Sequence, residues 1–205
     1  CESMKIKILI PIYNDWQSAD KLINKIDNIV KEINHEFSLV IVNDGSSEIK
    51  PDGFGFSENL NSVQILNIKK NMGHARCIAT GLKHIFQNDE FDYIIPMDGD
   101  GEDRPEEIKI FIDNLSYNPD TTIVGERVKR SEGIIFKLSY SIHKLITFIF
   151  TGKSIKFGNY TFLPKKTVEK LINDKSTWSS FSGALSKLEK NLATIPSERG
   201  ARYFG

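Results

Sequence analysis

Short apolar runs alternate with longer amphipathic stretches along the first two thirds of the chain, and this alternation constrains the fold more than any other feature. Apolar, β-branched runs predict strands at residues 5–12, 37–42, 62–68, 92–97 and 121–126. Between them, apolar residues at helical spacing predict helices at residues 19–33, 73–86 and 105–115. A chain with this rhythm forms a mostly parallel sheet with helices on both faces. The sequence therefore predicts the α/β class with a Rossmann-like sheet.

The last third of the chain is less regular. It predicts a strand over residues 156–164, a short helix over residues 165–172, and a strand followed by a loop over residues 191–205. Residues 134–150 carry isoleucines and leucines along one face and lysines along another. That pattern predicts a helix, which either packs against the core or lies on the surface of an anionic membrane.

Length and charge limit the kind of protein this is. Residues 4–205 are predicted to form one domain, and residues 1–3 to be a cloning remnant ahead of it. Lys+Arg and Asp+Glu both number 27, so no strong positive field favours nucleic acid as a partner. Two cysteines, Cys1 and Cys77, are too few for a disulfide framework or a zinc site and favour a reducing, cytosolic setting.

The stretch DYIIPMDGDGEDRPEEI places Asp98, Asp100, Glu102 and Asp103 directly after an apolar run. Carboxylates this close repel one another, so a positive charge is expected beside them. Two of them in a glycine-bearing turn at a strand end can point at one position. Hard divalent cations prefer oxygen ligands, and Mg²⁺ is usually shared between carboxylates and substrate phosphates. The turn therefore predicts a Mg²⁺ or Mn²⁺ site at Asp98 and Asp100 that also binds a diphosphate.

Three other interpretations of this turn were weighed. A calcium loop of the EF-hand type is excluded, because Asp103 and Lys109 stand where that loop needs glycine and glutamate. A phosphatase of the haloacid-dehalogenase kind also carries D-x-D after a strand, but usually near the amino terminus. A solvated acidic turn that caps the helix at Pro105 is the simplest alternative, since carboxylates stabilise helix amino termini.

Polar residues also follow the other predicted strands. Pro11, Tyr13 and Asp15 come after the first strand, Asp44 comes after the second, and Ala75 lies in the first turn of a helix after the third. Each has an ordinary explanation, such as a rim aromatic or an Asx turn. In open α/β sheets, however, ligands bind beyond the carboxyl ends of the strands, so these residues are expected to share one crevice with the acidic turn.

Taken together and in this order, the motifs resemble the family 2 glycosyltransferases of the GT-A fold. The similarity is greatest to the branch that contains dolichyl-phosphate mannose synthase and bacterial polyprenyl-phosphate sugar transferases. It runs from about residue 5 to 205 and is strongest in ILIPIYND, LVIVNDGSS, NMGHARCIATGL, MDGDGEDRPEEI and VGERVKR. The resemblance implies an inverting transfer from a nucleotide-diphospho-sugar to a polyprenyl phosphate or another cell-envelope glycan acceptor, at the cytoplasmic face of a membrane.

The resemblance also implies roles for individual residues. The nucleotide-sugar site would be lined by residues from all four loops, namely Pro11, Ile12, Tyr13, Asp15, Val42, Asp44, Ala75, Asp98 and Gly99. Asp98 and Asp100 would hold the divalent metal. Asp100, Glu102 and Arg127 are the catalytic candidates, with Arg127 near the donor phosphates and Glu102 where relatives often have glutamine. A carboxylate at Asp44 suits uracil better than guanine, which favours UDP over GDP.

The sequence departs from the family at Asn159, where relatives often have an acid in a segment that resembles Gly-Asp-Phe-Arg. An amide cannot act as a general base. A lipid-phosphate acceptor needs no base, whereas a sugar hydroxyl would require Glu102, Asp103 or Glu126. A nucleotide-sugar-binding module without transfer activity is therefore the alternative.

The carboxyl-terminal segment ERGARYFG is followed in relatives by transmembrane helices. The resemblance thus implies a catalytic domain separated from a membrane anchor. Arg199 and Arg202 are expected to face either phosphates or solvent.

Overall fold

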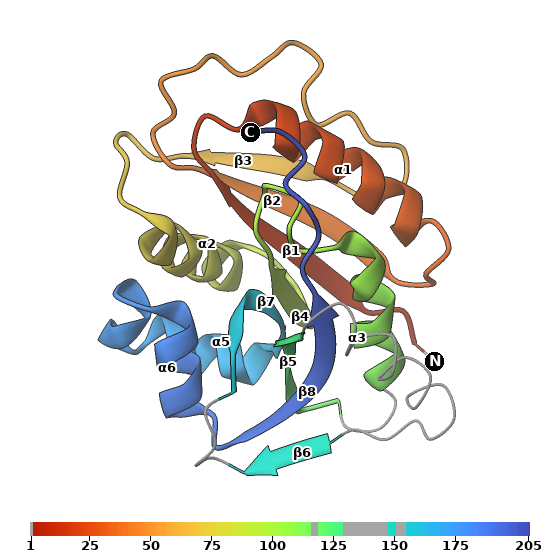
Figure 1. The fold of residues 1–205 in the computed structure, drawn as a ribbon, viewed down its shortest axis with the longest axis vertical. Coiled ribbons are helices and arrows are strands. Elements are labelled where there is room, and N and C mark those ends of the chain that lie inside the picture. Colours follow the sequence, from red (N-terminus) through yellow and green to blue (C-terminus); the bar gives the residue numbers. More distant parts are fainter. Residues whose placement is uncertain (1, 116–118, 129–146, 151–154) are drawn as a thin grey trace.

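The computed structural model describes residues 2–115, 119–128, 147–150 and 155–205. Within these residues the strands form one eight-stranded sheet of order β3-β2-β1-β4-β7-β5-β8-β6 (Figure 1). The strands are β1 (Lys5–Ile12), β2 (Glu36–Asn43), β3 (Val63–Asn67), β4 (Tyr93–Pro96), β5 (Thr122–Val128), β6 (Thr147–Phe150), β7 (Phe157–Pro164) and β8 (Asn191–Glu198). The α-helices are α1 (Trp16–Val30), α2 (His74–Asn88), α3 (Ile108–Asn114), α5 (Lys165–Ile172) and α6 (Phe181–Leu188), and the 3₁₀ helices are η1 (Pro105–Glu107) and η2 (Lys175–Trp178).

The amino-terminal half of the sheet is parallel. β1 pairs with β2 and β4, and β2 pairs with β3, all in parallel register. β7 then enters antiparallel to both β4 and β5, and β5 pairs in parallel with β8. The carboxyl ends of β1, β2 and β4 therefore meet at one edge, which is where the sequence placed the polar loops.

Helices cover both faces of the sheet, with α1 and α3 on one side and α2, α5 and α6 on the other (Figure 1). The alternation of β1 explains this arrangement. Ile6, Ile8 and Ile10 pack in the cluster that contains α1 and α3, whereas Leu9 packs in the cluster that contains α2. The predicted α/β class with a Rossmann-like sheet is confirmed.

One predicted helix is wrong at its carboxyl end. Residues 129–146 lie outside the described residues, and they include residues 134–146 of the helix expected over residues 134–150. Thr147–Phe150 form β6, which pairs antiparallel with β8. Helical spacing of apolar residues did not reveal this pairing, because an exposed strand edge such as that of β8 can recruit a short segment whatever its local pattern. No helix among the described residues is both long and apolar enough to span a bilayer.

Candidate active site

Hydrogen bonds join the loops that follow β1 and β2. The Asp44 backbone N–H donates to the Ile12 carbonyl at 2.8 Å. Asn14, at φ 57°, donates from its backbone N–H to Ser46 Oγ at 2.9 Å and from its side chain to Ser47 Oγ at 3.0 Å. Asparagine adopts this left-handed conformation more readily than most residues. The first two loops therefore form one unit at the sheet edge.

The loop after β3 joins this unit through Asp44. Its buried carboxylate accepts from the backbone N–H of Met72 at 2.7 Å and of Gly73 at 3.0 Å. Gly45 lies at φ +68°, and a Cβ there would stand only 2.6 Å from the Asn71 nitrogen. Asp44 thus holds the turn that leads into α2. Its contact with a nucleobase stays a prediction, which requires the carboxylate lone pairs that these two bonds leave free.

The other residues expected to bind nucleoside differ in accessibility. Tyr13 is 47% exposed at the rim, and Asp15 and Ala75 are half-buried. The side chains of Ile12 and Val42 are buried in the two core clusters on opposite faces of the sheet. The structure therefore brings these residues to the same edge, but Ile12 and Val42 present backbone there rather than side chain.

Close approach of Gly99 joins the acidic turn to the tip of β1. A Cβ at Gly99 would lie 3.0 Å from Ile12 Cγ2 and 3.4 Å from the Pro11 carbonyl. A larger residue would fit here only if the Ile12 side chain moved by a few tenths of an ångström. Asp98 and Asp100 therefore lie beside the loop that carries Tyr13.

Each carboxylate of the acidic turn accepts a hydrogen bond from a different donor. Asp98 Oδ1 accepts from Asn159 Nδ2 at 2.9 Å, and the Asp98 N–H donates to Asp103 Oδ2 at 2.8 Å. Asp100 Oδ1 accepts from the Glu102 N–H at 2.9 Å. Asn159, which stands where the family resemblance predicted an acid, is thus a donor to one of the predicted metal ligands.

Two arginines from the segment after β8 neutralise this turn. Arg199 donates to Glu102 and lies 3.8 Å from Asp98 Oδ2 and 3.7 Å from Asp103 Oδ1. Arg202 Nε lies 3.6 Å from Asp100 Oδ2. The sequence predicts a metal ion as the counter-charge of the turn and places these arginines near either phosphate or solvent. In the structure the arginines themselves supply positive charge to the turn.

Burial and neighbouring charges shift the pKa values of these carboxylates in different directions. Burial, together with the neighbouring Asp98 and Glu102 charges, raises the pKa of Asp100. Burial and the Asp98 charge also raise the pKa of Asp103. The hydrogen bond from Arg199 instead lowers the pKa of Glu102. Glu102 is therefore ionised and engaged, which makes it a weak candidate for a general base, and Asp103 is too buried to reach an acceptor.

The donor set of this turn fits a divalent cation of the Mg²⁺ or Mn²⁺ type. Asp98 and Asp100 offer carboxylate oxygens at a strand tip, and such cations are commonly bound through one or two carboxylates plus phosphate oxygens. Among the described residues no group of three or more His, Cys, Asp or Glu side chains is arranged to hold a metal alone. The residues present therefore suit a cation that arrives with a phosphate ligand.

Arg127 approaches the same site from β5. The register between β5 and β7 shifts between Val124 and Glu126, just before Arg127. β-Bulges of this kind re-aim side chains beside functional sites. The guanidinium then lies against Gly158, where any Cβ would collide with it. Gly158 precedes Asn159, so Arg127 approaches the Asp98–Asn159 pair without touching it in the contacts described.

A family model described as Glycosyl transferase family 2 matches residues 7–179. The chain belongs to glycosyltransferase family 2. The family that the motifs predicted is thereby confirmed.

Relatives of this family 2 chain act on a polyprenyl phosphate by name. An undecaprenyl-phosphate 4-deoxy-4-formamido-L-arabinose transferase of Proteus mirabilis (strain HI4320) is 28% identical over 160 residues, which cover 76% of this chain and 46% of that protein. The transferase of the same name from Salmonella choleraesuis (strain SC-B67) is 25% identical over 208 residues, which cover 98% of this chain and 61% of that protein. The family 2 chain thus spans only part of the length of these relatives.

Solved structures agree on the fold. The mannosyltransferase PcManGT from Pyrobaculum calidifontis, in complex with GDP-Man and Mn²⁺, superposes with a TM-score of 0.62 at 14% identity over 100% of this chain and 59% of its own. S. aureus TarS 1–349, in complex with UDP-GlcNAc, gives a TM-score of 0.59 at 12% identity over 98% of this chain and 60% of its own. The predicted GT-A fold is confirmed.

Sequence reasoning missed Asn14 and Gly158 in this family 2 site, and it named Arg199 and Arg202 without finding their partners. Asn14 links the first two loops, Gly158 makes room for Arg127, and Arg199 and Arg202 pair with the acidic turn. The only sequence signal was a pair of arginines just after the last predicted strand. Their partners lie about a hundred residues earlier in the chain, and a local sequence pattern does not predict contacts over that distance.

Replacing Asn159 with aspartate is expected to lower the free energy of unfolding by about 1–2 kcal/mol at neutral pH. The change removes the donor to Asp98 and places a second negative charge against it. Urea denaturation followed by circular dichroism measures the loss, and Asn159→Ala, which adds no charge, should lose less. Full stability combined with faster transfer in Asn159→Asp would contradict this role and point to an acid at position 159 in catalysis.

Proposed function

We propose that this chain is the catalytic part of an inverting glycosyltransferase that moves a sugar from a nucleotide diphosphate, with UDP favoured over GDP, to a polyprenyl phosphate. Family membership supports sugar transfer, and the names of the relatives support the lipid acceptor. The acceptor would place the reaction at the cytoplasmic face of a membrane. No nucleic acid is involved.

One observation carries the proposal most directly. Gly99 packs against the tip of β1, so the acidic turn and the Tyr13 loop lie side by side. A nucleotide sugar requires these two loops to lie close together, because its base and its diphosphate are parts of one small molecule. Tyr13, exposed at the rim, is available to stack on the base, and Asp98 with Asp100 would bind the diphosphate.

In the proposed reaction the acceptor oxygen attacks the anomeric carbon while the nucleoside diphosphate leaves. A divalent cation held by Asp98 and Asp100 would supply Lewis-acid stabilisation of the charge on that leaving group. Arg127 would add a charge-assisted hydrogen bond to the phosphates. Asn159 holds Asp98 in orientation rather than removing a proton.

The absence of an acid at position 159 favours a phosphate as acceptor. A lipid phosphate oxygen is already anionic and attacks without a general base. Among the carboxylates considered for that task, Glu102 is paired with Arg199, Asp103 is buried, and half-buried Glu126 alone remains for a hydroxyl acceptor.

Calorimetric titration of UDP and GDP, each with Mg²⁺, with Mn²⁺ and with chelator, tests the donor and the metal together. We expect UDP to bind more tightly than GDP, and binding to weaken strongly when chelator removes the cation. Equal affinity with and without chelator would refute the metal role. Donor consumption with added undecaprenyl phosphate separates an enzyme from a binding module, since a module binds nucleotide but consumes no donor.

A further inference from the structure

The segment after β8 lies across the acidic turn and is bonded to it along the backbone. The Gly200 N–H donates to the Glu102 carbonyl at 2.8 Å, and the Tyr203 N–H donates to the Asp100 carbonyl at 2.9 Å. We call residues 199–204 the strap. Its arginines reach the carboxylates of the same turn, as described above.

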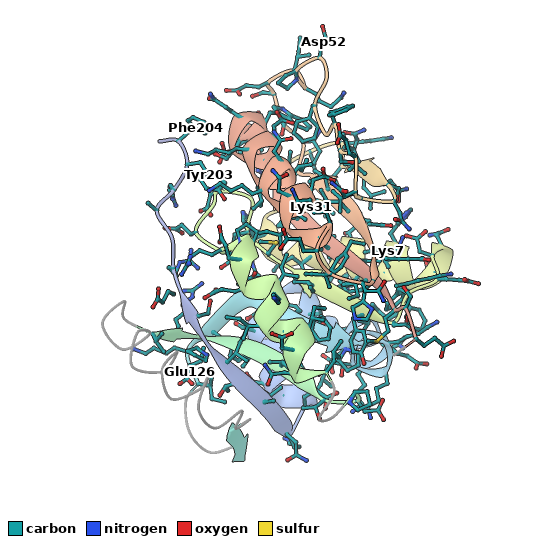
Figure 2. All side chains as sticks on the ribbon, turned by 90° about the vertical axis from the view of Figure 1, so that its right-hand side faces the viewer. Lys7, Lys31, Asp52, Glu126, Tyr203 and Phe204 are labelled. Atoms are coloured by element: carbon teal, nitrogen blue, oxygen red, sulfur yellow. The ribbon has the colours of Figure 1, made fainter. Side chains whose placement is uncertain are left out.

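Tyr203 anchors the strap through its ring. Gly101 lies beneath it at φ +95°, and a Cβ there would stand 2.6 Å from the ring. Above it, the amines of Lys21 and Lys25 lie 4.8 Å and 4.7 Å from the ring centre, within the range of cation–π attraction. Figure 2 shows Tyr203 and Phe204 beside α1, which carries both lysines. We call these four contacting residues, Gly101, Lys21, Lys25 and Tyr203, the clasp.

The middle of the strap, between Gly200 and Tyr203, is exposed to solvent. Ala201 is exposed, and the Arg202 side chain is 63% exposed. A pocket of about 350 Å³ beside this segment is lined by Lys21, Lys25, Arg104 and Tyr203, among others. Beside the ion pairs that Arg199 makes with the acidic turn, the clasp is therefore a second side-chain anchor between the strap and the body of the protein.

The arginines and a divalent cation would bind the same carboxylate oxygens of this turn. Arg199 and Arg202 approach Asp98 Oδ2 and Asp100 Oδ2, which are the oxygens left free by the bonds from Asn159 and Glu102. A cation bound by the two aspartates would use those oxygens. Each arginine that is held near them also repels a cation.

We propose that Tyr203 is a positioning residue for the cation site, which holds Arg199 and Arg202 against Asp98 and Asp100 and so sets how strongly a divalent cation must compete for these carboxylates. The inference rests on the proposed function, because it takes the two aspartates as the cation ligands. Weakening the clasp frees the arginines, and the cation then meets a more negative turn.

The test compares the wild-type chain with Tyr203→Leu, Tyr203→Phe and the matched control Phe56→Leu, an exposed phenylalanine outside the strap, all without nucleotide. Mn²⁺ affinity is measured by electron paramagnetic resonance, and strap docking by mass spectrometry of tryptic cleavage after Arg199 and Arg202. We expect Tyr203→Leu to bind Mn²⁺ about two- to fivefold more tightly and to be cleaved faster, because leucine cannot make the cation–π contacts. Phenylalanine keeps the ring, so Tyr203→Phe should behave like the wild type, as should Phe56→Leu, which leaves the strap unchanged.

Weaker or unchanged Mn²⁺ binding in Tyr203→Leu, with cleavage accelerated, would overturn the proposal, because a freed strap would then not matter to the cation. Unchanged cleavage would overturn it as well, because the ring would not be the anchor. Donor consumption by the wild-type chain is measured separately. Its presence with no Mn²⁺ difference refutes the strap alone, whereas its absence refutes the proposed function.

Discussion

Asp100→Asn is expected to lower the rate of sugar transfer by about 10²–10³ without loss of the fold, since preorganised electrostatic groups at a reacting centre typically contribute that much. Asparagine matches aspartate in shape but lacks the negative charge that a cation requires. The structure also predicts that the variant folds well. Burial, together with the Asp98 and Glu102 charges, raises the pKa of Asp100, so replacing the carboxylate by a neutral amide costs the fold little.

Transfer is measured as donor consumption with undecaprenyl phosphate over a panel of UDP- and GDP-sugars, and stability by urea denaturation. Asp113→Asn is the matched control, because it makes the same chemical change at an exposed position of α3. Its rate should equal that of the wild type. A wild-type rate in Asp100→Asn with chelator present would refute the role of Asp100.

Asp27→Ala is expected to lower the free energy of unfolding by about 3 kcal/mol, the largest stability effect that we anticipate. From α1, the buried Asp27 carboxylate accepts four hydrogen bonds from the loop before β3. The donors are the backbone N–H groups of Glu58, Asn59 and Leu60 and the Asn59 side chain, at 2.8–3.2 Å. Alanine leaves these donors without their acceptor, and urea denaturation measures the cost.

Asp20→Ala provides the control for Asp27, because Asp20 on the same helix accepts only one bond from this loop, from the Gly55 N–H at 3.1 Å. Its loss should be under about 1 kcal/mol. A loss in Asp27→Ala no larger than that of Asp20→Ala would contradict the assigned role.

The Asp27 contribution also depends on pH. Burial alone would raise the pKa of Asp27, but the hydrogen bonds from Asn59, Glu58 and Leu60 outweigh it and lower that pKa. An acid with a lowered pKa stabilises the fold fully above its unfolded value of about 4, and the contribution is lost as the pH falls through the folded value. The difference in stability between wild type and Asp27→Ala should therefore shrink below about pH 4.

The amino-terminal half could be predicted from local pattern, because each of its elements has a clear period and a clear end. Leu22, Ile23 and Ile26 mark one face of α1, and Gly73 marks the start of α2. Parallel strands then bring their carboxyl ends together, so Tyr13, Asp44 and Asp98 were expected at one edge before any coordinates. The pairing of Thr147–Phe150 with β8 could not be predicted, because a short strand depends on its neighbour rather than on its own residues.

Periodicity and motif order were enough to establish the α/β class, the family and the place of the acidic turn at a strand tip, because these depend on residues close together in the chain. The counter-charges of that turn were decided by the folded structure alone. Arg199 and Arg202 meet Asp98, Asp100 and Glu102 only because β8 returns beside β5 and directs the following segment across the turn. Contacts between residues about a hundred positions apart arise from the path of the chain in space, on which local sequence carries no information.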